Sequence, residues 1–224
     1  MFGKTLILIL FKNIFKKYKN KYYSEKRKLI FMGFDLDIHP KVYHENYIEA
    51  TKFLADIMIT EKLSDKYLLE IGNTCGLISI FAAKKGAIAS IKTDDDSLLE
   101  SLIKNTIKNE VEIRYVGSNW DFEIKEQKQD FIIINPIHLN NYSEDWEKFS
   151  WDFTDNYEYF KNLFEKLPDI IHSRTVVWLP LDKKSPFDIY KIMANKNGLQ
   201  MELNGERNYL LNDIFMFKIY QTKH

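Results

Sequence analysis

The sequence predicts an α/β protein built on a doubly wound, mostly parallel sheet of seven strands with an antiparallel strand at its C-terminal end. Two observations support this prediction. From residue 67 onward, short apolar segments alternate with segments whose apolar residues recur at helical spacing, and this alternation is typical of βαβ units. The last two strand-like segments are joined by only about eight residues. Because a parallel crossover needs about a dozen or more, these two strands should pair antiparallel.

Each element follows from its own pattern of apolar residues. Strands are expected where apolar residues run together, at 67–71, 88–93, 112–116, 131–134, 175–179, 199–204 and 213–221. Helices are expected where apolar residues recur every three or four positions, at 45–61, 77–85, 96–108, 160–167 and 186–196. The fourth of these helices should end before Pro168, because proline cannot donate a backbone hydrogen bond. Shorter β-like segments lie between residues 29 and 43.

The formal net charge of zero hides an asymmetry between two parts of the chain. Residues 1–30 hold nine basic side chains and one acidic side chain, a net charge of +8, so residues 31–224 carry −8. Apolar residues spaced four apart predict that this arm forms a basic amphipathic helix: Leu6, Leu10, Ile14, Tyr18 and Tyr22. We therefore expect an N-terminal helical arm at 1–30 and one domain at 31–224. Three roles are open for this arm: it would pack on that domain, or it would contact RNA phosphates, or it would lie on a membrane surface, which we expect least.

Composition and missing motifs argue against several other classes. A single cysteine, Cys75, cannot form an intramolecular disulfide, and no apolar run approaches the length of a membrane span, so a cytoplasmic location is expected. The five histidines lack metal-ligand spacing, so no metal is expected. No Gly-x-Ser-x-Gly hydrolase motif occurs, and the Gly-x-Gly-x-x-Gly of a nicotinamide-dependent dehydrogenase is absent.

The first strand of the alternating region leads into a glycine-containing turn that opens a helix. Gly72 and Gly76 lie in this turn, and Glu70 precedes it. Asp94 ends the next predicted strand, 24 residues after Glu70. An acid at that place is well positioned to accept hydrogen bonds from two ribose hydroxyls. The pattern therefore predicts a Rossmann-like cofactor site at the carboxyl edge of the sheet.

These residues resemble the first two motifs of the class I S-adenosylmethionine-dependent methyltransferases. The first motif, acid-x-Gly-x-Gly-x-Gly, matches at Glu70, Gly72 and Gly76, whereas Thr74 replaces the middle glycine. This replacement is compatible with the turn if Thr74 needs no positive φ. The resemblance implies a cofactor site for S-adenosyl-L-methionine formed by Glu70, Gly72, Asn73, Thr74, Gly76 and Asp94.

The loop after the third strand of this region resembles the segment that binds adenine in the same family. Ser118, Asn119 and Trp120 lie in it, and Asn119 stands where the family has an acid. The amide oxygen of Asn119 can still accept a hydrogen bond from the adenine amino group. Trp120 would cover the adenine face or fill the core, and these two roles are equally compatible with the sequence.

The fourth strand of the region ends in Asn135-Pro136-Ile137-His138. This segment resembles the Asn-Pro-Pro-Tyr motif of the branch that methylates amino nitrogens, which includes the HemK-type glutamine methyltransferases and the methyltransferase small-domain enzymes acting on RNA bases. The resemblance implies that the Asn135 side-chain oxygen and the Pro136 carbonyl hold two N–H groups of the acceptor. The nitrogen lone pair then points toward the methyl group. His138 would stack on the acceptor in place of the tyrosine.

Three functions remain open from the sequence. The first is an S-adenosylmethionine-dependent enzyme that methylates an amino or amide nitrogen of RNA or protein, with the basic arm helping to hold RNA. The second is a small-molecule methyltransferase of the same fold, and the third is a catalytically degenerate binding protein. The methyl acceptor is not fixed by the sequence, since residues 139–156 would cover its pocket. The oligomeric state is not fixed either.

Overall fold

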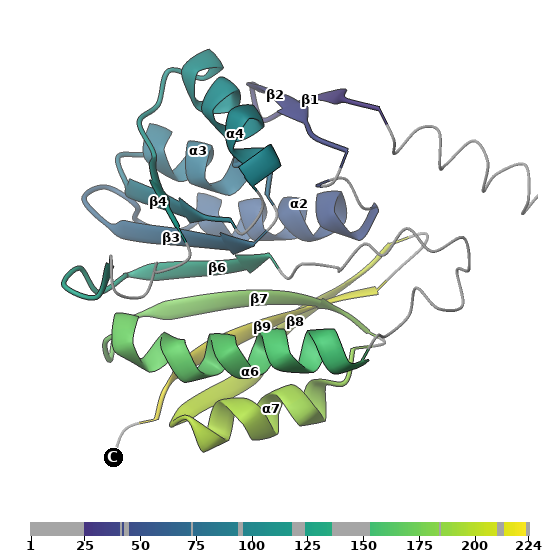
Figure 1. Ribbon diagram of the computed structural model, residues 1–224, viewed down its shortest axis with the longest axis vertical. Coiled ribbons are helices and arrows are strands. Elements are labelled where there is room, and N and C mark those ends of the chain that lie inside the picture. The colour runs from purple at the N-terminus through teal and green to yellow at the C-terminus, as the bar shows by residue number, and fades with distance from the viewer. Residues whose placement is uncertain are drawn as a thin grey trace, which may run out of the picture.

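The computed structural model describes residues 25–40, 42, 45–72, 74–93, 96–117, 124–135, 153–183, 185–209 and 213–222. Its central feature is a seven-stranded sheet with helices on both faces (Figure 1). Residues 1–24 of the predicted arm lie outside the described residues, so its helical form stays a prediction. Within the described residues, no helix has the length and apolar character needed to cross a membrane.

The sheet has the strand order β5-β4-β3-β6-β7-β9-β8. Its strands are β3 (Tyr67–Gly72), β4 (Ile88–Lys92), β5 (Arg114–Val116), β6 (Phe131–Asn135), β7 (Val176–Asp182), β8 (Leu199–Asn208) and β9 (Asp213–Gln221). The first five are parallel to one another, whereas β9 runs antiparallel to both β7 and β8. The predicted doubly wound sheet and its antiparallel C-terminal strand are therefore confirmed.

Helices cover both faces of this sheet because side chains alternate between the faces along each strand. On one face, Leu69 and Ile132 pack with α6 (Phe153–Ile170) and α7 (Phe187–Lys196). On the other face, Leu68 and Ile133 pack with α2 (Glu45–Ile59) and α3 (Leu77–Lys84). A third helix, α4 (Asp96–Lys108), joins α3 on this second face (Figure 1).

A separate two-stranded hairpin precedes the main sheet. It consists of β1 (Arg27–Phe31) and β2 (Phe34–Ile38), which pair antiparallel. The hairpin packs against α4, and Leu36 and Ile38 of β2 are buried among apolar residues of α3, α4 and β4. Residues 27–30, which the sequence assigned to the arm, thus belong to a strand of this hairpin.

The predicted end of the fourth helix is wrong. The helix expected to end before Pro168 continues to Ile170, with the proline inside it. Proline removes the hydrogen bond that its nitrogen would donate to the Phe164 carbonyl. Burial compensates for this loss, because Leu167, Ile170 and Ile171 on the last turn and just after it are fully buried in the core.

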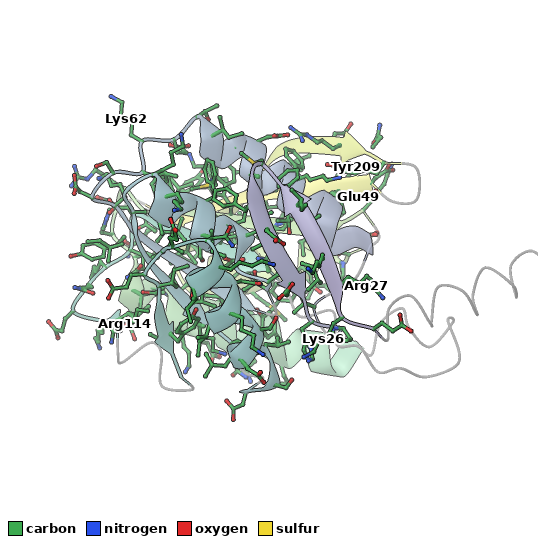
Figure 2. All side chains as sticks on the ribbon, turned by 90° about the horizontal axis from the view of Figure 1, so that it is seen from above. Lys26, Arg27, Glu49, Lys62, Arg114 and Tyr209 are labelled. Carbon is green, nitrogen blue, oxygen red and sulfur yellow. The ribbon has the colours of Figure 1, made fainter. Side chains whose placement is uncertain are left out.

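The hairpin of β8 and β9 reaches across to α2. The Tyr209 hydroxyl donates to the Glu49 carbonyl over 3.1 Å, and Figure 2 shows these two residues next to each other. The Arg207 guanidinium lies 4.3 Å from the centre of the Phe53 ring and pairs with Asp56 at 2.5 Å. The C-terminal end of β8 therefore lies against α2.

Candidate active site

The candidate site lies where the strand order reverses. From β3 the chain proceeds to β4 on one side, and it later returns to place β6 on the other side. The carboxyl ends of β3 and β6 therefore flank the crevice in which open α/β sheets bind ligands. Gly72 at the end of β3 and Asn135 at the end of β6 are register partners. Two of the residues predicted for the cofactor and for the acceptor thus meet side by side.

Glycine is required twice in the turn after β3. Gly72 has φ +121°, and a Cβ there would lie 1.8 Å from the Asn135 carbonyl oxygen. Gly76 has φ +83°, and a Cβ there would lie 3.2 Å from Leu102 Cδ2. Thr74 occupies the position of the middle glycine of the motif. The Thr74 hydroxyl also accepts a hydrogen bond from the Gly76 amide at 2.9 Å.

Glu70 lies beneath this turn and is fully buried. Its Oε1 accepts from Thr74 Oγ1 at 2.5 Å and from Asn135 Nδ2 at 2.6 Å. Its Oε2 accepts from the backbone N–H and the hydroxyl of Ser79, at 3.1 and 2.6 Å. Four donors match the roughly four acceptor positions of a carboxylate. Glu70 therefore connects the turn, the first turn of α3 and the end of β6.

Burial raises the pKa of the Glu70 carboxyl above its usual value of 4.5, and the hydrogen bonds from Ser79, Thr74 and Asn135 offset that rise only in part. The same carboxyl also lies at the N-terminal end of α3, where it accepts the N–H of the third helical residue. A negative charge is favourable at this end of a helix.

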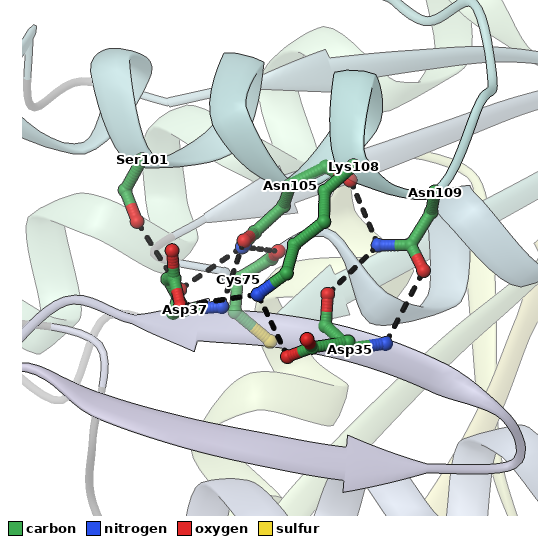
Figure 3. Close-up of polar contacts among 7 residues, drawn as sticks. All are labelled: Asp35, Asp37, Cys75, Ser101, Asn105, Lys108 and Asn109. Atoms are coloured by element: carbon green, nitrogen blue, oxygen red, sulfur yellow. Dashed lines mark hydrogen bonds and ion pairs between the residues drawn. The ribbon is translucent and has the colours of Figure 1, made fainter.

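A second polar cluster, which the sequence did not reveal, fixes the β1–β2 hairpin to α4 (Figure 3). Asn109 accepts from the Asp35 N–H at 3.2 Å and donates to the Asp35 carbonyl at 3.0 Å. Asn105 forms the same pair of bonds with Asp37, at 2.8 and 3.0 Å. Each side-chain amide thus bonds the backbone of β2 as a neighbouring strand would.

Asn105 also reaches the candidate site. Its Nδ2 donates to the Cys75 carbonyl at 3.0 Å, and the Asn105 side chain is fully buried. The hairpin, α4 and the glycine turn are consequently held by one side chain. The available sequence signal was the spacing of Asn105 in α4 and Asn109 just after it, because residues four apart share one face of a helix.

The structure brings together five of the predicted site residues: Glu70, Gly72, Thr74, Gly76 and Asn135. Seven others lie outside the described residues: Asn73, Asp94, Ser118, Asn119, Trp120, Pro136 and His138. Their roles stay predictions. Ser79 was missed by the sequence interpretation, although it is the one polar residue among the first seven of α3. Over the described ranges, no group of three or more His, Cys, Asp or Glu side chains is arranged to hold a metal.

Strand order and the glycine turn at its reversal point give the protein a Rossmann-like fold, which it shares with solved methyltransferase structures. Within that class, the chain belongs to the methyltransferase small domain family, whose model matches residues 34–149. The resemblance inferred from the motifs is thereby confirmed.

One curated relative agrees with this assignment, and two solved structures share the fold. A putative protein N5-glutamine methyltransferase from Methanocaldococcus jannaschii is 38% identical over 110 residues, which cover 48% of this chain and 52% of that protein. The chain thus matches about half the length of this curated relative. A methyltransferase structure from Pyrococcus furiosus superposes with a TM-score of 0.61 at 18% identity, covering 93% of this chain and 98% of the other. The structure of M. jannaschii TYW2 in complex with S-adenosylmethionine superposes with a TM-score of 0.56 at 13% identity, covering 88% of this chain and 87% of the other.

Proposed function

We propose that the protein transfers a methyl group from S-adenosylmethionine to the side-chain amide nitrogen of a glutamine in a protein. The observation that carries the proposal is the position of Asn135, which is buried at the end of β6 with its Nδ2 bonded to Glu70. This arrangement leaves Oδ1 as the atom that can accept a hydrogen bond from an acceptor nitrogen. The relative at 38% identity, named for glutamine methylation, supports an amide as the acceptor.

The glycine turn supports S-adenosylmethionine as the cofactor. Because Gly72 has no Cβ and adopts a positive φ, the end of β3 lies directly against the backbone of Asn135, and the glycine turn begins beside the proposed acceptor site. Gly72, Thr74 and Gly76 would shape the cofactor site beside Asn135. In this proposal, Asn73, Asp94, Ser118, Asn119 and Trp120 complete it, with Asp94 on the ribose and Asn119 on the adenine.

The chemistry asks the protein to orient the acceptor rather than to activate it with a strong base. An amide nitrogen is a poor nucleophile because its lone pair is conjugated with the carbonyl. Asn135 Oδ1 and the Pro136 carbonyl would hold the two N–H groups so that the lone pair turns toward the methyl carbon, and His138 would pack on the amide plane. The bound cofactor supplies a methyl group on a sulfonium sulfur; attack by the nitrogen breaks the S–CH3 bond, leaves S-adenosylhomocysteine and releases one proton to solvent.

The test uses S-adenosylmethionine carrying a labelled methyl group. The full chain is incubated separately with total protein and with total RNA from the expression host, and labelled products are hydrolysed in acid. A methyl group on a glutamine amide is released by this treatment as labelled methylamine. We expect labelled methylamine from the protein fraction.

Other outcomes contradict the proposal in distinguishable ways. Label that stays on RNA bases would replace the glutamine acceptor by a base amino group, with the basic arm as the candidate RNA contact. Label in neither fraction would overturn a macromolecular acceptor. If calorimetry detected no binding of S-adenosylhomocysteine at high micromolar concentration, both enzyme functions would be contradicted. The remaining function would be that of a binding protein with this fold.

A further inference from the structure

Glu70 and Asn135 come from neighbouring strands and form a direct hydrogen bond inside the protein. Asn135 Nδ2 donates to Glu70 Oε1 at 2.6 Å, and both side chains are buried. No other hydrogen bond to the Asn135 side chain occurs among the described residues. Among the described residues, this contact therefore determines which way the Asn135 amide points.

An ionised Glu70 permits only one direction for that hydrogen bond. Thr74 and Ser79 supply three further hydrogen-bond donors to the carboxyl group. A carboxylate only accepts, so Asn135 must present its nitrogen to Glu70. The same direction holds for a protonated Glu70 whose proton lies on Oε2, because the Ser79 hydroxyl can turn to accept that proton while Oε1 accepts from Asn135.

An amide whose nitrogen points inward directs its oxygen the other way. An Asn135 amide turned by 180° would offer donors to an acceptor nitrogen that itself has two N–H groups, and no hydrogen bond would form. The orientation of the amide thus separates a competent site from an incompetent one.

We infer that Glu70 is a positioning residue for methyl transfer: it fixes the Asn135 amide so that Oδ1 faces the methyl acceptor. This inference rests on the proposed function in that Asn135 binds the acceptor nitrogen. It assigns Glu70 a role through Asn135 rather than through direct contact with the cofactor. It also links the acceptor site to the glycine turn, because Thr74 of that turn shares Oε1 with Asn135.

The first test needs no substrate. In a 15N-labelled full chain, the side-chain amide signals of Asn135 are assigned by their loss in Asn135→Asp. A hydrogen bond to a buried carboxyl should shift one amide proton downfield and slow its exchange with solvent by at least about tenfold relative to an exposed asparagine. An Asn135 amide that exchanges as fast as an exposed side chain would overturn the inference.

The second test exchanges the carboxyl group of Glu70 and the amide group of Asn135, first one position at a time. In Glu70→Gln, the new Oε1 must accept from Ser79, so Nε2 faces Asn135 and turns its amide over. We expect kcat/KM for methyl transfer to fall about 100-fold, with the affinity for S-adenosylhomocysteine changed less than about threefold. Asn135→Asp places a second carboxyl against Glu70 and should lose at least as much activity.

The double variant Glu70→Gln with Asn135→Asp restores the polarity. The introduced glutamine would donate from Nε2 to one oxygen of the introduced aspartate, and the other aspartate oxygen would again accept from the substrate. We expect activity at least about tenfold above either single variant, because the two changes compensate each other. If Glu70 served only the stability of the protein, the double variant would be no more active in methyl transfer than the less active single variant. That result would overturn the inference.

These outcomes are separable from failure of the proposed function. A wild-type chain that methylates no acceptor would contradict the proposed function, while the amide exchange measurement would still decide the Glu70–Asn135 contact. An active wild-type chain whose Glu70→Gln variant keeps full activity would contradict the inference alone.

Discussion

Gly72 lies so close to Asn135 that a Cβ on the glycine would be 1.8 Å from the asparagine carbonyl oxygen. The two residues are register partners at the ends of neighbouring parallel strands. Close contact at this point brings the backbone of the predicted cofactor turn directly against the residue predicted to hold the methyl acceptor. The lack of a side chain at residue 72 is therefore a condition for both halves of the site.

Gly72→Ala should destabilise the protein strongly. The new methyl group would overlap the Asn135 backbone, and alanine would also have to adopt φ +121°. We expect a loss of about 3 kcal/mol in the free energy of unfolding, since neither strand end can move without disturbing the sheet. Urea denaturation followed by circular dichroism measures this loss.

Gly33→Ala is the matched control. Gly33 also has a positive φ, +85°, but nothing lies within 4 Å of the position of its Cβ. Only the conformational cost remains, about 1 kcal/mol. Equal losses for the two variants would show that overlap with Asn135 is not what requires glycine at residue 72.

Asn105→Ala should release the β1–β2 hairpin from α4. The substitution leaves the Asp37 N–H and the Cys75 carbonyl without the side-chain amide that bonds them, and unsatisfied buried groups are costly. We expect about 3 kcal/mol of destabilisation and faster hydrogen exchange at the Asp37 amide. Lys108→Met, which removes ion pairs to Asp35 and Asp37 at the surface, should leave that exchange rate nearly unchanged. Similar exchange in the two variants would contradict this account of the hairpin.

The stability of the protein should depend on pH through Glu70. Burial raises the pKa of this carboxyl in the folded protein above 4.5, so the folded protein binds the proton more tightly than the unfolded chain. Its contribution to the free energy of unfolding therefore decreases as the pH rises from 4.5 through the raised pKa, and is constant above it.

The Glu70→Gln variant isolates this effect because glutamine does not titrate. The difference in free energy of unfolding between the wild type and Glu70→Gln should become smaller as the pH rises through that window. A difference that grows with pH would indicate that the hydrogen bonds from Ser79, Thr74 and Asn135 lower the pKa of Glu70 instead.

Asp94→Ala should weaken cofactor binding without affecting the orientation of the acceptor. In the proposed site, Asp94 accepts hydrogen bonds from the ribose hydroxyls, and charge-assisted bonds of this kind contribute about 1 to 3 kcal/mol. Calorimetry with S-adenosylhomocysteine measures the loss. An unchanged affinity would remove Asp94 from the cofactor site.

The sequence predicted the parts of this fold that local patterns specify. Apolar runs located β3, β4, β6 and β9 to within a residue or two, and the motifs identified Glu70, Gly72 and Asn135 before their proximity was known. The end of α6 was mispredicted because burial of Leu167 and Ile170 outweighs the local effect of Pro168.

Contacts between distant residues were beyond the sequence patterns. The bonds of Ser79 to Glu70 and of Asn105 to Asp37 join residues from different elements, and no spacing rule specifies them. The sequence likewise suggested Glu70 as a residue near the cofactor, whereas the structure surrounds its carboxyl with four donors from the protein itself.

Methyl transfer by Asn135→Ala in a single turnover, with S-adenosylmethionine bound to the enzyme, tests the central claim most directly. If Asn135 holds the acceptor nitrogen, transfer should fall by at least about 100-fold, while the affinity for S-adenosylhomocysteine stays within about threefold of the wild type. An Asn135→Ala variant that transfers the methyl group at the wild-type rate would contradict the assignment of the acceptor site.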